Sequence, residues 1–124
     1  MSLQIKRIYD PYEESDGARY LVDRLWPRGI SKEKAHLAGW LKDLAPSTAL
    51  RKQFGHMAES FGGFSAIYPD ELDANPAAQA VAHEVIRQSQ QQTVTLLYGA
   101  RDPRMNHAVV LRDYLEEKFQ EKQA

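Results

Sequence analysis

The chain has 124 residues, 43% of them hydrophobic, which predicts a single domain with one core over residues 1–124. Its 16 lysine and arginine residues nearly balance 17 aspartate and glutamate residues, and the net charge of -1 argues against a general polyanion binder. The lack of cysteine excludes disulfides, thiolate metal sites and cysteine nucleophiles. No apolar run is long enough to span a bilayer and no signal-peptide core is present, so we predict a cytoplasmic protein without a membrane partner.

Four stretches of the chain are typical of strands, and they span residues 3–9, 19–22, 37–44 and 93–98. The second and the last contain unbroken apolar runs of the kind found in sheets that are covered on both faces. Residues 37–44 fit helical spacing as well, and we favour a strand because Pro46 and good helix caps follow. The nine residues 10–18 are few for a parallel crossover, so the first two strands could be antiparallel neighbours or be joined by a compact excursion.

Helix starts are indicated by four residues with capping side chains, Ser31, Ser47, Asn75 and Asn106. The helix predicted over residues 77–90 has one apolar face and is suited to cover a sheet. Apolar residues also recur at helical spacing between residues 61 and 72, where Pro69 predicts a break, a kink or the first turn of a new helix.

Strands separated by helical stretches predict an α/β fold, a three-layer Rossmann-like domain with a mostly parallel sheet of about four strands flanked by helices. No Gly-x-Gly-x-x-Gly fingerprint is present, so dinucleotide binding is not implied. The spacing of the histidines matches no metal motif, and the pattern identifies no particular cofactor.

The stretch 19–30, RYLVDRLWPRGI, runs from a buried strand into a loop that carries two guanidinium groups and an indole. Ligands of open parallel sheets bind beyond the carboxyl ends of the strands, and arginine suits bidentate contact with phosphate or carboxylate. We therefore expect an arginine-rich crevice that binds a small anion. The expected ligand-binding residues are Arg24, Trp26, Arg28, Gly29, Tyr98, Arg101 and Asn106.

His107 and Asp23 are the candidates for proton transfer at this crevice, as general acid and base. Each candidate also has a structural interpretation. A histidine at this position is about equally often tied to a neighbouring carbonyl, Arg24 could pair with an adjacent aspartate, and Trp26 could pack in the core. Asn106 is most simply a helix cap. The pattern does not distinguish an enzyme from a receptor for the same anion.

Three segments together, RLWPRG at 24–29, LAPSTALRKQFGH at 44–56 and LLYGARDPRMNHAVVL at 96–111, resemble the bacterial DUF488 family of unknown function, close to its YeaO-like branch. The resemblance runs over nearly the whole chain. It implies a single α/β domain from a bacterial cytoplasm. It implies no reaction, so no catalytic residue is transferred from the family.

Small-anion binding is the first functional hypothesis, and replacing Arg28 with alanine should then abolish binding while the fold survives. The second is nucleic-acid binding, in which Arg51, Lys52 and Arg104 join the same arginines on phosphates and Trp26 stacks on a base. The third is a protein interaction module anchored by the Trp26 loop. The nearly neutral net charge counts against the second, and the oligomeric state is not indicated.

Overall fold

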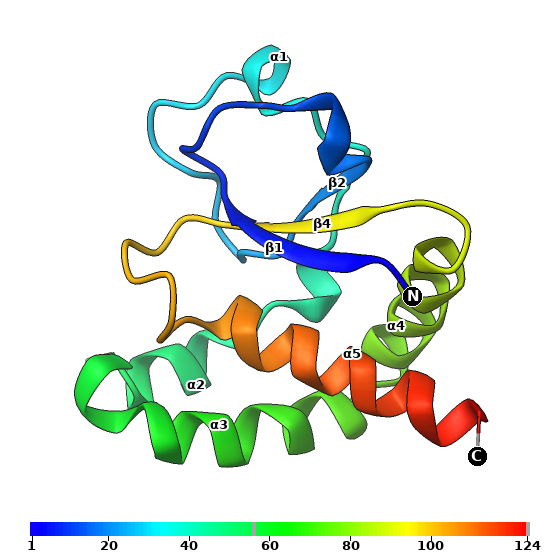
Figure 1. Ribbon diagram of the computed structural model, residues 1–124. Coiled ribbons are helices and arrows are strands. Elements are labelled where there is room, and N and C mark those ends of the chain that lie inside the picture. The colour runs from blue at the N-terminus through cyan, green and yellow to red at the C-terminus, as the bar shows by residue number, and fades with distance from the viewer. Residues whose placement is uncertain (56, 124) are drawn as a thin grey trace.

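The computed structural model describes residues 1–55 and 57–123, which form an α/β fold around a parallel sheet (Figure 1). The four strands lie in the order β1 (Leu3–Arg7), β4 (Val94–Tyr98), β2 (Ala18–Leu21) and β3 (Gly39–Trp40). All three neighbouring pairs are parallel. The predicted α/β class and parallel sheet are confirmed. The first two strands are not neighbours, because β4 lies between them, and the short turn η1 (Glu14–Asp16) lies in their connection.

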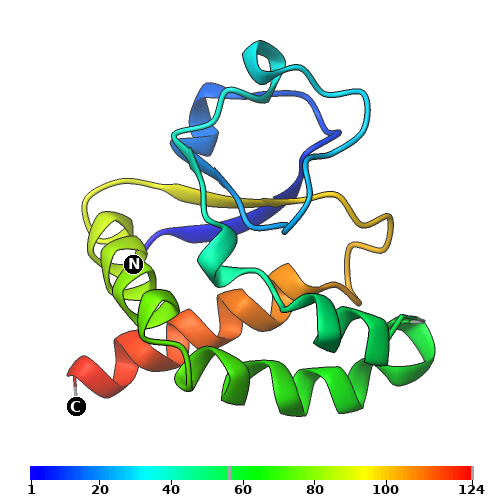
Figure 2. The same ribbon diagram turned by 180° about the vertical axis from the view of Figure 1, so that it is seen from behind.

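Helices cover the two faces of the sheet unequally (Figures 1 and 2). One side carries the helices α2 (Thr48–Gln53), α3 (Met57–Asp73), α4 (Pro76–Ser89) and α5 (His107–Gln123). Of the described elements, the other side carries α1 (Lys32–Ala35), the turn η1 and the loops around them. None of the described helices is long and apolar enough to cross a membrane.

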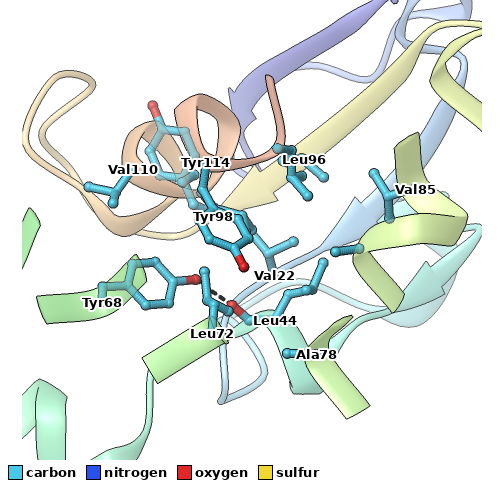
Figure 3. Packing of buried hydrophobic residues seen from close by; sticks show 14 of the residues in the cluster. Val22, Leu44, Tyr68, Leu72, Ala78, Val85, Leu96, Tyr98, Val110 and Tyr114 are labelled. Atoms are coloured by element: carbon cyan, nitrogen blue, oxygen red, sulfur yellow. Dashed lines mark hydrogen bonds between the residues drawn. The ribbon is translucent and has the colours of Figure 1, made fainter. Parts of the chain in front are cut away.

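The larger core lies between the sheet and the long helices (Figure 3). Every residue of β4 is buried, as expected for a central strand covered on both faces. Successive side chains alternate between the faces, so Leu96 joins the larger core and Leu97 joins the smaller core beneath α1. The buried hydroxyl of Tyr68 donates a hydrogen bond to the Leu44 carbonyl, which satisfies both polar groups inside the larger core.

The four predicted caps are confirmed, since each side chain accepts a hydrogen bond from a backbone N–H in the first turn of its helix. The strand predicted over residues 37–44 is shorter, because only Gly39 and Trp40 pair with β2 before the turn η2 (Lys42–Leu44) directs Leu44 into the larger core. Of the three outcomes predicted at Pro69, a break and the first turn of a new helix are wrong, and the kink of α3 lies at Ser60 instead. The backbone of α3 leaves helical angles at Ser60, just before two glycines that weaken a helix, and continues as helix through Pro69.

A buried ionic network that the sequence pattern did not reveal joins η1, β2 and α1. Arg19 is 2% exposed and forms an ion pair with Asp16, which is also 2% exposed. The Nζ of Lys6 lies 3.1 Å from Asp16 Oδ1, and Arg19 Nε donates to the carbonyl of Ala35 at 3.1 Å. Burial raises the pKa of Asp16, but hydrogen bonds from the Glu13 backbone, Lys6 and Arg19 outweigh it and hold the pKa below its ordinary value.

Candidate anion-binding cavity

A cavity of about 580 Å³ opens beyond the carboxyl ends of β2 and β4. Its size lies within the usual range of small-molecule sites. The walls come from the exit loop of β2, from α2 and its preceding turn, from the exit of β4 and from the start of α5. The lining residues are Asp23, Arg24, Leu25, Pro46, Thr48, Arg51, Lys52, Phe54, Gly55, Gly99, Ala100, Met105, Asn106 and His107. The sequence predicted a site at this edge of the sheet, and α2, which also contributes to the cavity lining, lies close to the start of α5 (Figures 1 and 2).

Asp23 and His107 form a pair at the floor of the cavity. The Nε2 of His107 lies 3.1 Å from Asp23 Oδ1 and 3.0 Å from the carbonyl oxygen of Val22. The other carboxylate oxygen, Oδ2, accepts a hydrogen bond of 2.9 Å from the backbone N–H of Gly99. Oδ1 is buried and forms no hydrogen bond with the described residues, while Nε2 of His107 beside it is hydrogen-bonded to the Val22 carbonyl. The carboxylate thus joins the exits of β2 and β4 to the start of α5.

The surroundings of His107 indicate which ring nitrogen carries a proton. Both groups next to Nε2 are hydrogen-bond acceptors, which assigns a proton to Nε2. In the neutral ring Nδ1 is then an acceptor, and it forms no hydrogen bond with the described residues. The ring of Tyr68 packs edge-on at 6.4 Å between centroids. Burial raises the pKa of Tyr68 well above its ordinary value, so its hydroxyl remains a donor to Leu44.

Three cationic side chains line the same cavity, and they differ in what they contact. Arg24 donates from Nε to the Pro46 carbonyl at 2.9 Å and from Nη2 to the Ala45 carbonyl at 3.2 Å. Arg51 and Lys52 are exposed on α2 and have no hydrogen bond or ion pair with the part of the chain that the structure describes. The cavity therefore has two unpaired positive charges, and Asp23 is its one acidic lining residue.

The predicted site residues separate into two groups. Asp23, Arg24, Asn106 and His107 line the cavity together. Asn106 is also the cap of α5, donating to the Asp102 carbonyl at 2.8 Å and accepting from the Val109 N–H at 3.1 Å. These contacts confirm its capping role.

Tyr98 and Trp26 lie outside the cavity lining. Tyr98 is 3% exposed, and burial raises the pKa of its hydroxyl. Trp26 packs on the opposite face of the sheet, 5.4 Å from Trp40 in an edge-on arrangement, and donates to the Ile30 carbonyl at 2.7 Å. It is therefore a packing residue in this structure.

The other three predicted ligand contacts are exposed residues beyond the lining: Arg28, Gly29 and Arg101. The carbonyl of Arg28 accepts a hydrogen bond of 2.8 Å from the hydroxyl of Tyr9. Gly29 adopts a φ of +76°, a conformation that favours glycine, so its role in this loop is a tight turn.

Several lining residues were missed as ligand contacts from the sequence. Arg51 and Lys52 were considered only for a nucleic acid, because nothing local places α2 beside the exits of β2 and β4. Leu25, Phe54 and Met105 give the cavity an apolar wall. Leu25 is 66% exposed, and only the folded structure shows that it lines the same cavity as Phe54. Among the described residues no cluster of three or more acidic, histidine or cysteine side chains could hold a metal ion.

The fold and the cavity define a class of α/β protein with a parallel sheet. At the carboxyl ends of its strands lies a cavity whose lining includes arginine and lysine side chains. The chain belongs to the DUF488 family, since the family model described as the inactive DUF488-N3 subclade matches residues 2–124. It is similar to the uncharacterized protein YeaO of Escherichia coli K12, with 44% identity over 115 residues, 93% of this chain and 97% of that protein. The uncharacterized protein Rv3073c of Mycobacterium tuberculosis H37Rv is 36% identical over 113 residues, 91% of this chain and 92% of that protein. No solved structure matches the chain significantly.

We expect Arg24 to position α2. Its guanidinium holds the carbonyls of Ala45 and Pro46, directly before the cap of that helix. Replacing Arg24 with glutamine should lower the free energy of unfolding by about 2 kcal/mol, because charge-assisted hydrogen bonds are lost. Amide hydrogen exchange in α2 should become faster, while exchange in α4 stays unchanged. Replacing the half-buried Arg112, which pairs with Asp113 on α5, with glutamine is the control. Unaltered exchange in α2 of the Arg24 variant would contradict the positioning role.

Proposed function

We propose that the protein binds a small anion, bearing a phosphate or a carboxylate, in the cavity at the carboxyl edge of the sheet. The observation that carries this proposal is the pair Arg51 and Lys52, which line the cavity without partners among the described residues. Two adjacent unpaired cations attract an anion, and a concave site strengthens the attraction because solvent screening is reduced there. The carboxylate of Asp23 opposes the attraction in part, and its contacts with His107 and the Gly99 N–H fix it at the exits of β2 and β4.

We further propose binding without turnover. The matching family model is described as inactive, which favours a receptor over an enzyme. Asp23 and His107 would then orient the ligand and close the floor of the cavity. A protein that consumed its ligand would contradict this part of the proposal, while the binding itself would stand.

Nucleic-acid binding through the same loop is less well supported. That hypothesis used Trp26 to stack on a base, whereas the indole packs against Trp40 on the other face of the sheet. The two functions also differ in their dependence on salt, because release of counterions from several phosphates makes nucleic-acid affinity fall steeply with salt. A single compact anion held by two side chains should lose far less affinity.

The test is a thermal-shift titration with inorganic phosphate, citrate and a short oligonucleotide, since a ligand of the native state raises the melting temperature. We expect the double variant Arg51→Gln/Lys52→Gln to weaken binding of the small anions by about tenfold or more per side chain removed. The variant Lys32→Gln/Lys34→Gln removes two exposed charges from α1 and is the matched control. We now expect Arg28→Ala to bind normally, because Arg28 does not line the cavity.

Equal binding by the wild type and the Arg51 and Lys52 variant would overturn the proposed site. Tighter binding of the oligonucleotide than of any small anion, with a steep loss of affinity as salt rises, would favour the nucleic-acid function.

A further inference from the structure

We propose that the ligand is an organic phosphate with a flat apolar body and a hydrogen-bond donor at the end opposite the phosphate. This inference rests on the proposed anion binding and adds the chemical class of the molecule. It follows from three kinds of surface that share one cavity: the cations of α2, an apolar wall and the His107 ring.

The cations of α2 locate the phosphate. Arg51 and Lys52 are neighbours in sequence, both exposed and both part of the lining. Arginine offers a planar fork and lysine a point charge, and both suit phosphate oxygens. The hydroxyl of Thr48, one turn earlier on the same helix, also lines the cavity and can donate a further hydrogen bond.

The apolar wall requires more than an inorganic anion. Leu25, Phe54 and Met105 line the cavity, and Leu25 leaves 66% of its surface exposed. Large apolar side chains exposed around a concave site are typical of pockets that bind an organic molecule. The volume of about 580 Å³ is also far larger than a single phosphate ion needs. An unsaturated or aromatic ring would cover this wall and keep water from it.

The floor of the cavity selects for a donor. Nε2 of His107 faces the Val22 carbonyl and Asp23 Oδ1, both acceptors, so Nε2 carries a proton. The donor requirement belongs to the neutral ring, in which Nδ1 is an acceptor. A ligand N–H or O–H would satisfy Nδ1, whereas a ligand carbonyl or ether oxygen would face another acceptor. Asp23 thus acts as a positioning residue, because it favours the tautomer of His107 that can accept a hydrogen bond from the ligand.

Matched phosphonates test the three parts of the inference, with affinities measured by isothermal titration calorimetry. The probes are inorganic phosphate, 4-methoxybenzylphosphonate and 4-hydroxybenzylphosphonate. We expect the methoxy compound to bind at least about tenfold more tightly than phosphate, because its ring covers the apolar wall. The hydroxy compound should bind up to about tenfold more tightly again, because it alone has the donor.

Two variants separate the contributions. Leu25→Ser should reduce the advantage of the ring compounds over inorganic phosphate, because it removes part of the apolar wall, and the exposed side chain adds little to the core. Ile67→Ser, at a residue of α3 that is 40% exposed and outside the lining, is the matched control. The Arg51→Gln/Lys52→Gln variant should weaken all three probes together.

Nitrogen-15 NMR of the His107 ring gives a readout that does not depend on a ligand. We expect a neutral ring protonated on Nε2 in the free protein and the same form in the complex with the hydroxy compound. A proton on Nδ1 in the free protein, or equal affinities for the hydroxy and methoxy compounds, would overturn the donor requirement. Equal affinities for inorganic phosphate and both phosphonates would overturn the proposed class while leaving anion binding intact, and no binding of any probe would overturn both.

Discussion

Replacing Asp16 with alanine is expected to lower the free energy of unfolding by about 3 kcal/mol, because it leaves a buried positive charge without its partner. Arg19 is 2% exposed, so water cannot take the place of the Asp16 carboxylate at low cost. Lys6 also loses its contact of 3.1 Å. Urea unfolding of the two proteins at neutral pH measures the difference.

The same carboxylate makes stability depend on pH. The pKa of Asp16 is lower in the folded protein than in the unfolded chain, because hydrogen bonds from the Glu13 backbone, Lys6 and Arg19 outweigh the effect of burial. A lowered pKa contributes stability that is fully present above the unfolded value, about 4, and is lost as pH falls through the folded value. Below about pH 4 the wild type should therefore lose stability more steeply than the Asp16→Ala variant.

The control for Asp16 is Glu84→Ala, which removes an equally charged partner from the exposed pair with Arg87. Solvent screens that pair, so its loss should change the free energy of unfolding far less. Similar unfolding curves for the two variants would contradict the importance of the buried network.

Replacing Gly17 with alanine is expected to cost more than about 3 kcal/mol of unfolding free energy, through strain and a lost hydrogen bond. Gly17 has φ +65° and ψ -134°, a conformation that other residues rarely adopt. A Cβ atom there would lie 2.1 Å from the Thr93 carbonyl oxygen. That oxygen accepts the 2.9 Å hydrogen bond from Ala18 that begins the pairing of β2 with β4. Thermal and urea unfolding both measure the loss.

Gly62→Ala is the matched substitution for Gly17→Ala. Gly62 lies in α3, is exposed, and a Cβ atom there would meet nothing within 4 Å. Alanine should stabilise the protein by about 0.5–1 kcal/mol, because it reduces the entropy of the unfolded chain. A loss of less than about 1 kcal/mol for Gly17→Ala would show that the β2 to β4 pairing tolerates the clash, contrary to our expectation.

The edge of the sheet that carries the cavity was predictable because it follows from local patterns. Buried strands can be found from their apolar runs, and the residues just after them must lie at one edge once the strands are parallel. This reasoning placed Asp23, Arg24, Asn106 and His107 in one crevice, and the structure brings these four together. It also identified Asn106 as a cap, which the hydrogen bond to the Val109 N–H confirms.

The direction in which side chains leave a loop was not predictable in the same way. Trp26 and Arg24 are two residues apart, yet Trp26 packs on the α1 side of the sheet while Arg24 lines the cavity. That choice depends on Trp40 and on the Ala45 and Pro46 carbonyls, which are distant in sequence. An arginine in a motif can likewise contact a ligand or hold the backbone in place through hydrogen bonds. Only the positions of the carbonyl or carboxylate groups that accept its hydrogen bonds distinguish these roles.

The sequence by itself determined the class of fold, the caps of the helices and, on condition that the strands are parallel, the edge of the sheet at which the cavity lies, because helical and strand periodicity and capping chemistry act over a few neighbouring residues. The tertiary structure alone decided that β4 lies between β1 and β2, that Arg19 and Asp16 pair in the interior, and that α2 brings Arg51 and Lys52 to the cavity. The strand order and the position of α2 depend on contacts between residues far apart in the chain. Asp16 and Arg19 are only three residues apart, but their burial depends on more distant parts of the chain, including Lys6 and Ala35. Such contacts form only when the whole core is packed, and no local pattern encodes them.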